Sequence, residues 1–142
     1  MESNRAFAVK AERLEEQASK TMKGSFFGNF FSSKTDRSDQ ELEYFQQAAN
    51  CYKMAGDNDG AIRMFMKRIE CEESDRDKAE CYKEMSRIYK ESDVSKFLEY
   101  SQKAIALNRM AGRQSAAAQL TKECAQVLEE NYEYEQAADW YA

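Results

Sequence analysis

The chain has 142 residues, of which 33% are charged and 42% are hydrophobic, and its net charge is −5. It contains no proline, no histidine and only five glycines, which disfavours turn-rich β folds and excludes every mechanism that needs a histidine. The acidic balance argues against general nucleic-acid binding, so we expect no nucleic-acid partner. The N-terminus lacks the apolar core of a secretory signal, and no apolar run is long enough to span a membrane, so we expect a cytoplasmic protein.

The first predicted element is a helix over residues 4–22. Its apolar residues recur at spacings of three and four and form one narrow, alanine-rich stripe: Ala8, Ala11, Leu14, Ala18 and Met22. Such a stripe suits close packing against one neighbouring helix. Glu15 and Glu16 lie off this stripe, and we expect their carboxylates to be solvated.

A loop with unusual aromatic content is predicted over residues 23–37. The segment holds two glycines, three serines and four phenylalanines, namely Phe26, Phe27, Phe30 and Phe31. Adjacent side chains of an extended segment point in opposite directions, so one protein wall cannot bury all four rings. Insertion into a membrane is therefore favoured over packing against the first helix. Lys23 and Lys34 flank the rings, as expected beside anionic headgroups.

Six further helices are predicted from apolar periodicity and capping signals. They begin at Ser38, within residues 57–59, at Ser74 or Asp75, at Ser92-Asp93, at Ser115 and at Tyr132. Ser38 and Glu41 have the spacing of a capping box, and Gly56 and Gly112 are expected to end helices. About seven helices result.

These helices form a repeating unit. Tyr52, Tyr89 and Leu128 hold equivalent places near helix ends, 37 and 39 residues apart. A period of 36–40 residues indicates an all-α solenoid of antiparallel helical hairpins in a TPR-like, right-handed stack. We expect residues 1–142 to form one such domain. The apolar ending at Trp140-Tyr141-Ala142 suggests the N-terminal part of a longer solenoid.

The sequence offers no constellation for catalysis or cofactor binding. It lacks the glycine-rich nucleotide-binding motifs, so we expect neither enzymatic activity nor a cofactor. The cysteines lie at positions 51, 71, 81 and 124, and no two of them form a CxxC pair. A zinc site would need all four to converge, so buried free thiols in a reducing compartment are favoured, with no bound metal.

Three segments resemble the soluble NSF attachment protein (SNAP) family, particularly its alpha/beta type. They read AERLEEQASK, SFFGNFF and YFQQAANCYKMAGDNDGAIRMF, and the resemblance runs from Ala11 to the last residue. In that family a hydrophobic loop of pattern FFxx(L/F)F follows the first helix and precedes the solenoid. The resemblance implies that Phe26, Phe27, Phe30 and Phe31 touch lipid, with Lys23 and Lys34 beside them.

The resemblance also implies a non-enzymatic adaptor role and a set of partners. SNAPs coat the SNARE complex, a bundle of syntaxin-type, synaptobrevin-type and SNAP-25-type helices, and recruit the NSF-type AAA+ ATPase that dismantles it during vesicle-mediated transport. Several copies, each a monomer in solution, would act on one complex as peripheral membrane proteins. The family's C-terminal NSF-activating segment has no counterpart in these 142 residues.

On the SNARE-facing surface the resemblance points to Arg113 and Lys122. Arg113 matches the family's arginine after a helix-closing glycine, whereas Gln119 stands where the family has a lysine. Lys122 lies one turn further along. Two other functions remain open: a TPR-like scaffold that binds a peptide of a soluble partner, and a homo-oligomer that uses the phenylalanine loop as a clip.

Overall fold

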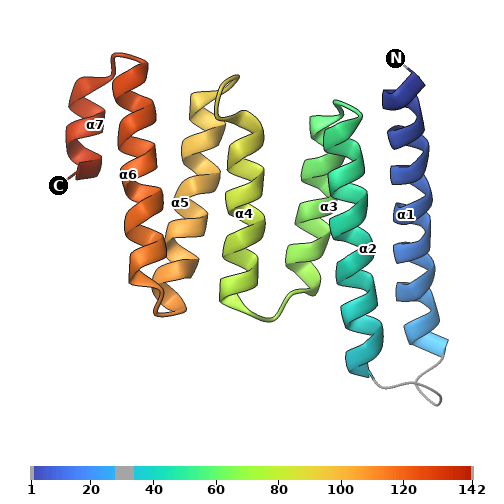
Figure 1. The fold of residues 1–142 in the computed structure, drawn as a ribbon. Coiled ribbons are helices and arrows are strands. Elements are labelled where there is room, and N and C mark those ends of the chain that lie inside the picture. The colour runs from blue at the N-terminus through green and yellow to red at the C-terminus, as the bar shows by residue number, and fades with distance from the viewer. Residues whose placement is uncertain (1, 28–33, 142) are drawn as a thin grey trace. The chain divides into compact units, whose positions relative to one another are not determined.

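The computed structural model describes residues 2–27 and 34–141, with side chains described for residues 4–20 and 39–141. All the regular secondary structure in these ranges is helical, which confirms the prediction of an all-α chain with seven helices (Figure 1). The helices are α1 (Glu2–Phe27), α2 (Lys34–Met54), α3 (Asn58–Cys71), α4 (Asp75–Tyr89), α5 (Val94–Met110), α6 (Gln114–Glu130) and α7 (Tyr134–Tyr141).

The chain divides into two compact units, residues 1–72 and residues 73–142. In the first unit α2 packs between α1 and α3. In the second, α5 packs against α4 and α6, and α6 packs against α7. Successive helices within each unit are antiparallel, as helical hairpins require (Figure 1). The prediction of one domain spanning residues 1–142 stays a prediction.

The local signals for helix boundaries are largely confirmed. Three N-cap side chains accept a backbone N–H three residues later: Asp57 at 2.9 Å, Ser74 at 3.4 Å and Asp93 at 3.1 Å. Gly56 and Gly112 close the turns after α2 and α5 with φ of +80° and +75°, a region that side chains with a Cβ rarely adopt.

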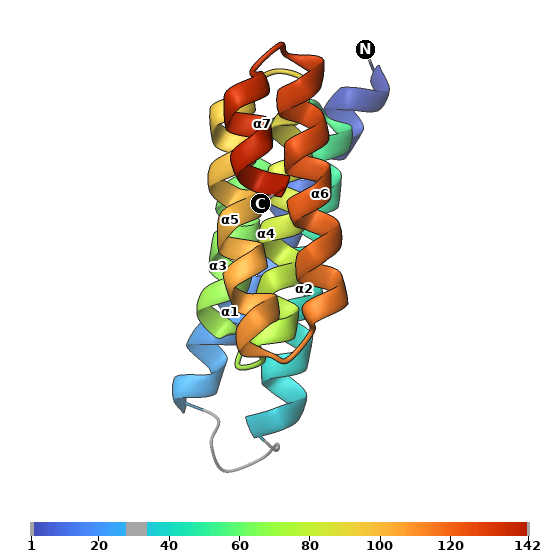
Figure 2. The ribbon, with the colours of Figure 1, turned by 90° about the vertical axis from the view of Figure 1, so that its left-hand side faces the viewer.

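The predicted loop is shorter in the structure than in the sequence analysis. α1 continues to Phe27 and α2 begins at Lys34, so the expected loop start at Lys23 and the capping box at Ser38 are wrong. Gly24 and Ser25 disfavour a helix by only about 1 kcal/mol or less each, which packing against a neighbouring helix can offset. Figure 2 shows the end of α1 and the start of α2 at the same end of the first unit.

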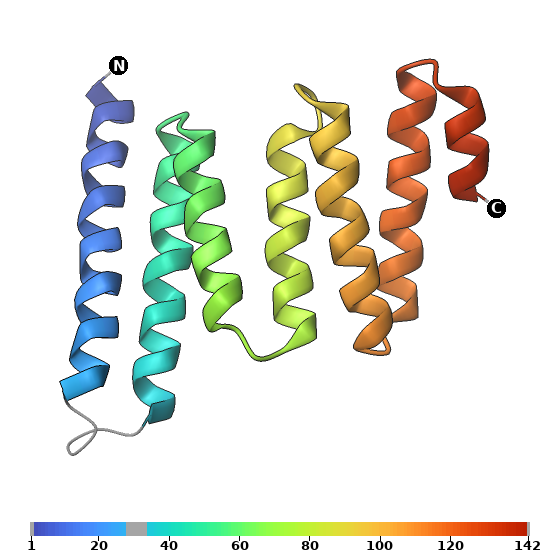
Figure 3. The same ribbon diagram turned by 180° about the vertical axis from the view of Figure 1, so that it is seen from behind.

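The core of the first unit combines small and aromatic residues, as the alanine-rich stripes predict. Ala11, Ala18, Ala48, Ala49 and Ala61 are fully buried, and these small side chains let α1, α2 and α3 approach closely (Figure 3). Phe45, Phe65 and Met64 fill the remaining space. Met66 of α3 is 38% exposed.

The core of the second unit holds Met85, Phe97, Ala104, Leu120 and Leu128. Cys51 in the first unit, and Cys81 and Cys124 in the second, are buried free thiols as predicted, while Cys71 is partly exposed. Burial raises the pKa of the Cys124 thiol to about 11, which keeps it protonated. Within the described ranges, none of the helices combines the length and the apolar character that crossing a bilayer demands.

Candidate functional site

A groove between α4 and α6 of the second unit contains Arg113, which the family resemblance assigned to a partner-binding surface. Its volume is about 110 Å³. The lining residues are Glu80, Lys83 and Arg87 from α4, Asn108 near the end of α5, and Arg113, Ala116, Gln119, Leu120 and Glu123 at the start of α6 or within it. Charged groups therefore come from both walls.

Two ion pairs cross the groove in the same register. Arg113 Nη1 lies 3.4 Å from Glu80 Oε1, and Lys90 Nζ lies 3.1 Å from Glu123 Oε1. Both pairs join residues 33 positions apart. A constant separation means that α4 and α6 run parallel. The first residue of α6, Gln114, accordingly lies opposite Cys81, which is about 9 Å along the helix axis from the first residue of α4.

Arg113 is held at both its backbone and its side chain. It follows Gly112, whose left-handed conformation turns the chain from α5 into α6. The Arg113 backbone N–H donates to the Asn108 carbonyl at 2.8 Å, and Nη1 donates to Asn108 Oδ1 at 3.3 Å. Asn108 is itself buried, so it gives the guanidinium a rigid support. One third of the Arg113 side chain remains exposed.

Gln119 and Lys122, the two other residues that the family resemblance brought into question, lie on different surfaces of α6. Gln119 lines the groove with Arg113. Lys122 is exposed on α6 but lies outside the groove lining. The structure thus brings Arg113 together with the uncharged Gln119 and not with Lys122.

The sequence analysis missed the cations of the opposite wall. Lys83, Arg87 and Lys90 follow one another at spacings of four and three, so Lys83 and Arg87 share one face of α4 with Lys90, its C-cap residue. That spacing was a visible signal, but it resembles ordinary solvated helix charge until α6 is placed beside it. The register of the two ion pairs puts Lys83 opposite Ala116 and Arg87 opposite Leu120.

The predicted membrane-binding residues lie at the margins of the described part of the chain. The backbones of Lys23, Phe26 and Phe27 belong to α1, and that of Lys34 begins α2. Phe30 and Phe31 lie outside the described residues, as do the side chains of the other four. The structure therefore places the two helices that carry this segment, and lipid contact stays a prediction.

A polar cluster joins the three helices of the first unit around Glu15. The Tyr52 hydroxyl donates to Glu15 Oε2 at 2.7 Å, and Arg63 Nη2 lies 3.0 Å from the same oxygen. Lys67 Nζ lies 3.5 Å from Oε1. The expectation that Glu15 is simply solvated is wrong: its partners lie 37 to 52 positions away, beyond the reach of local periodicity.

The partners of Glu15 set its ionisation. Burial alone would raise its pKa, but hydrogen bonds from Arg63 and Tyr52, with the charges of Arg63 and Lys67, hold the pKa below its ordinary value of 4.5. Burial, the hydrogen bond to Glu15 and its negative charge raise the pKa of Tyr52 to about 12. Glu15 is thus a carboxylate and Tyr52 a neutral donor at neutral pH.

Glu15→Gln is expected to lower the thermal stability of the chain at neutral pH and to matter less in acid. Since the folded pKa of Glu15 lies below its unfolded value, its ionisation stabilises the fold above pH ~4.5. That stabilisation is lost as the pH falls through the folded pKa. Thermal unfolding of both proteins between pH 7 and pH 3 measures this. A difference in melting temperature that stays constant across the range would contradict the assignment.

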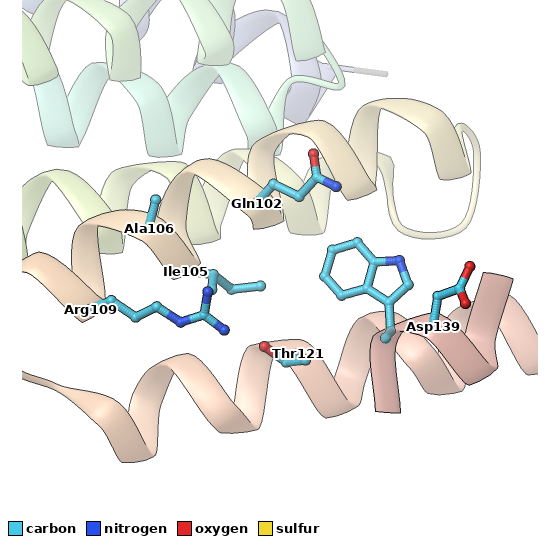
Figure 4. Close-up of a pocket in the computed structure, with 7 residues that line it drawn as sticks. Gln102, Ile105, Ala106, Arg109, Thr121 and Asp139 are labelled. Carbon is cyan, nitrogen blue, oxygen red and sulfur yellow. The ribbon is translucent and has the colours of Figure 1, made fainter. Parts of the chain in front are cut away.

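A second cavity, of about 450 Å³, opens between α5, α6 and α7 (Figure 4). Its lining residues are Gln102, Ile105, Ala106, Arg109, Thr121, Asp139 and Trp140. Gln102 and Arg109 on α5 lie across the cavity from Thr121 on α6 (Figure 4). Arg109 therefore belongs to a different surface from the α4–α6 groove, and it offers a matched control for charge changes there.

Comparisons with known proteins agree on family and fold. The family model described as "Soluble NSF attachment protein, SNAP" matches residues 9–142. An alpha-soluble NSF attachment protein from Vitis vinifera is 30% identical over 142 residues, which cover 93% of this chain and 47% of the relative. The chain thus spans about half the length of the curated relative it matches.

The fold comparison gives the architecture. A crystal structure of nearly identical TPR-like repeats, from a Podosopora anserina chain described as a kinesin light chain, matches with a TM-score of 0.54. The match covers 96% of this chain and 70% of the other, at 13% sequence identity. It confirms the predicted TPR-like α-solenoid.

Proposed function

Since the chain belongs to the soluble NSF attachment protein family, we propose that it is a non-enzymatic adaptor that binds SNARE complexes at membranes. In this role it contributes to SNARE disassembly by an NSF-type ATPase, and so to vesicle fusion and intracellular protein transport. We assign the SNARE and membrane contacts to the residues of this chain. Recruitment of the ATPase, which the family resemblance attributes to a C-terminal segment, has no candidate residues here.

The main structural support for the proposed SNARE contact is Arg113, whose side chain is held by Glu80 and Asn108. A guanidinium held by Asn108 and Glu80 has already lost much of its rotamer freedom, so binding costs it little further entropy. SNARE bundles, in this proposal, present acidic side chains to that surface. Complementary charge then sets the encounter rate and the register of a weak contact, which several adaptor copies together strengthen.

Arg113→Glu is expected to weaken retention of an assembled SNARE four-helix bundle about five- to tenfold, because it places a second carboxylate beside Glu80. Pull-down at increasing salt measures this, and the difference should shrink as salt screens the charges. Arg109→Glu, the same reversal outside the groove, should bind as the unchanged chain does. Full-strength binding by Arg113→Glu, with an unchanged far-ultraviolet circular dichroism spectrum, would remove Arg113 from the site.

A second candidate function is supported by the shape of the same groove. Lys83, Arg87 and Asn108 line a narrow depression, as in a TPR-like module that captures a short acidic peptide of a soluble partner. The two candidate functions differ in the partner that is bound, which is an assembled helix bundle in the first and a short peptide segment in the second. Binding of a short acidic peptide with no retention of an assembled SNARE bundle would favour the peptide module.

A further inference from the structure

We propose that the centre of the α4–α6 groove is a subsite for one carboxylate side chain of the protein partner. Lys83 and Arg87 on α4 would bind this carboxylate, and Ala116 on the opposite wall would leave room for it. This inference rests on the proposed function, since the partner we commit to is the SNARE bundle. It goes further by naming the cations that meet the ligand. Arg113, on which the proposed SNARE contact rests, lies at one end of the same groove.

The charges at the two ends of the groove are matched within the chain. At one end Glu80 accepts from Arg113, and at the other Glu123 accepts from Lys90. These contacts occupy the first and last of positions 80, 83, 87 and 90, which share one face of α4 and its C-cap residue Lys90. The intermediate positions are therefore the ones that face the middle of the groove.

The middle of the groove presents cations to an uncharged wall. The register of the ion pairs sets Lys83 opposite Ala116 and Arg87 opposite Leu120, so no carboxylate of α6 stands across from either. Ala116 has a short side chain and leaves room at this point. An incoming carboxylate would supply the charge that the opposite wall lacks.

The size of the groove and its carboxylates favour a small anionic group. Arg113 and Lys90 match Glu80 and Glu123, so Lys83 and Arg87 are the two cations left without a carboxylate across the groove. A polyphosphate would bring its further negative charges close to Glu80 and Glu123, at an electrostatic cost. A single Asp or Glu side chain, shared by the two cations, fits the volume of about 110 Å³.

The first experiment measures binding of an assembled SNARE bundle to the full chain. Arg87→Glu and Lys83→Glu should each weaken binding about three- to tenfold at low salt, with Arg109→Glu unchanged as the matched control. If the unchanged chain binds the bundle and both groove variants bind equally well, the subsite is overturned while the proposed function stands.

A second measurement does not depend on the SNARE bundle. A capped helical peptide with one central glutamate, and its glutamine counterpart, are titrated into the 15N-labelled chain. The glutamate peptide should move the amide resonances of residues 83, 87 and 116, and the glutamine peptide should not. Equal or absent responses to the two peptides overturn the subsite. Failure of SNARE binding with a glutamate-specific response would instead overturn the proposed function alone.

Discussion

Replacing Gly60 by alanine is expected to destabilise the first unit by about 1–3 kcal/mol, because the new methyl group would overpack a filled site. An added Cβ would lie 2.6 Å from Cδ1 of the Tyr52 ring and 2.8 Å from Asp57 Oδ2. The ring cannot easily give way, since Tyr52 is buried and its hydroxyl is bonded to Glu15. A loss of stability is unusual for this substitution, because alanine normally stabilises a helix by about 0.5–1 kcal/mol relative to glycine.

Chemical denaturation measures this change, and a double-mutant cycle identifies its cause. If the methyl group displaces the ring, the Tyr52 hydroxyl no longer reaches Glu15. Tyr52→Phe should then cost less in the Gly60→Ala background than in the unchanged chain. Gly56→Ala is the matched control, because an added Cβ at Gly56 meets nothing within 4 Å and strains only the backbone at φ +80°. A Gly60→Ala chain that is more stable than the unchanged one would contradict the packing.

Helix boundaries were predictable where a short-range contact decides them. Asp57, Ser74 and Asp93 cap their helices through a bond to a backbone group three residues away, so the sequence carries the whole signal. At Ser38 the same kind of local signal gave a wrong helix start, because α2 begins four residues earlier, at Lys34. Capping contributes about 1 kcal/mol, and packing between two long helices can outweigh it.

The candidate site was only partly predictable, because its contacts depend on how helices are aligned. The repeat of 36–40 residues indicates which helices are parallel but not their offset along the axis. The observed pairs Glu80–Arg113 and Lys90–Glu123 are separated by 33 residues, fewer than the repeat length. That offset selects Lys83 and Arg87 as groove residues. It comes from the packing of both helices against α5, which no local pattern encodes.

The double variant Phe26→Ser/Phe27→Ser is expected to abolish co-flotation with anionic liposomes while leaving the fold intact. Burying one phenylalanine is worth about 1.5–3 kcal/mol, so the loss of two lowers membrane affinity by roughly two to four orders of magnitude. Lys23 and Lys34 would add about 1 kcal/mol each near an anionic surface. Charge reversal at either lysine should therefore weaken flotation modestly and in a salt-dependent way.

An exposed aromatic pair elsewhere provides the control for this experiment. Tyr132 and Tyr134 are 79% and 61% exposed in the turn before α7 and at its first residue, and their rings contact each other edge to face. Glutamates at positions 129, 130, 133 and 135 surround them, so an anionic surface repels this pair. Tyr132→Ser/Tyr134→Ser should leave flotation unchanged. If both double variants float as the unchanged chain does, phenylalanine insertion is wrong, whereas equal losses in both would indicate nonspecific aromatic adsorption.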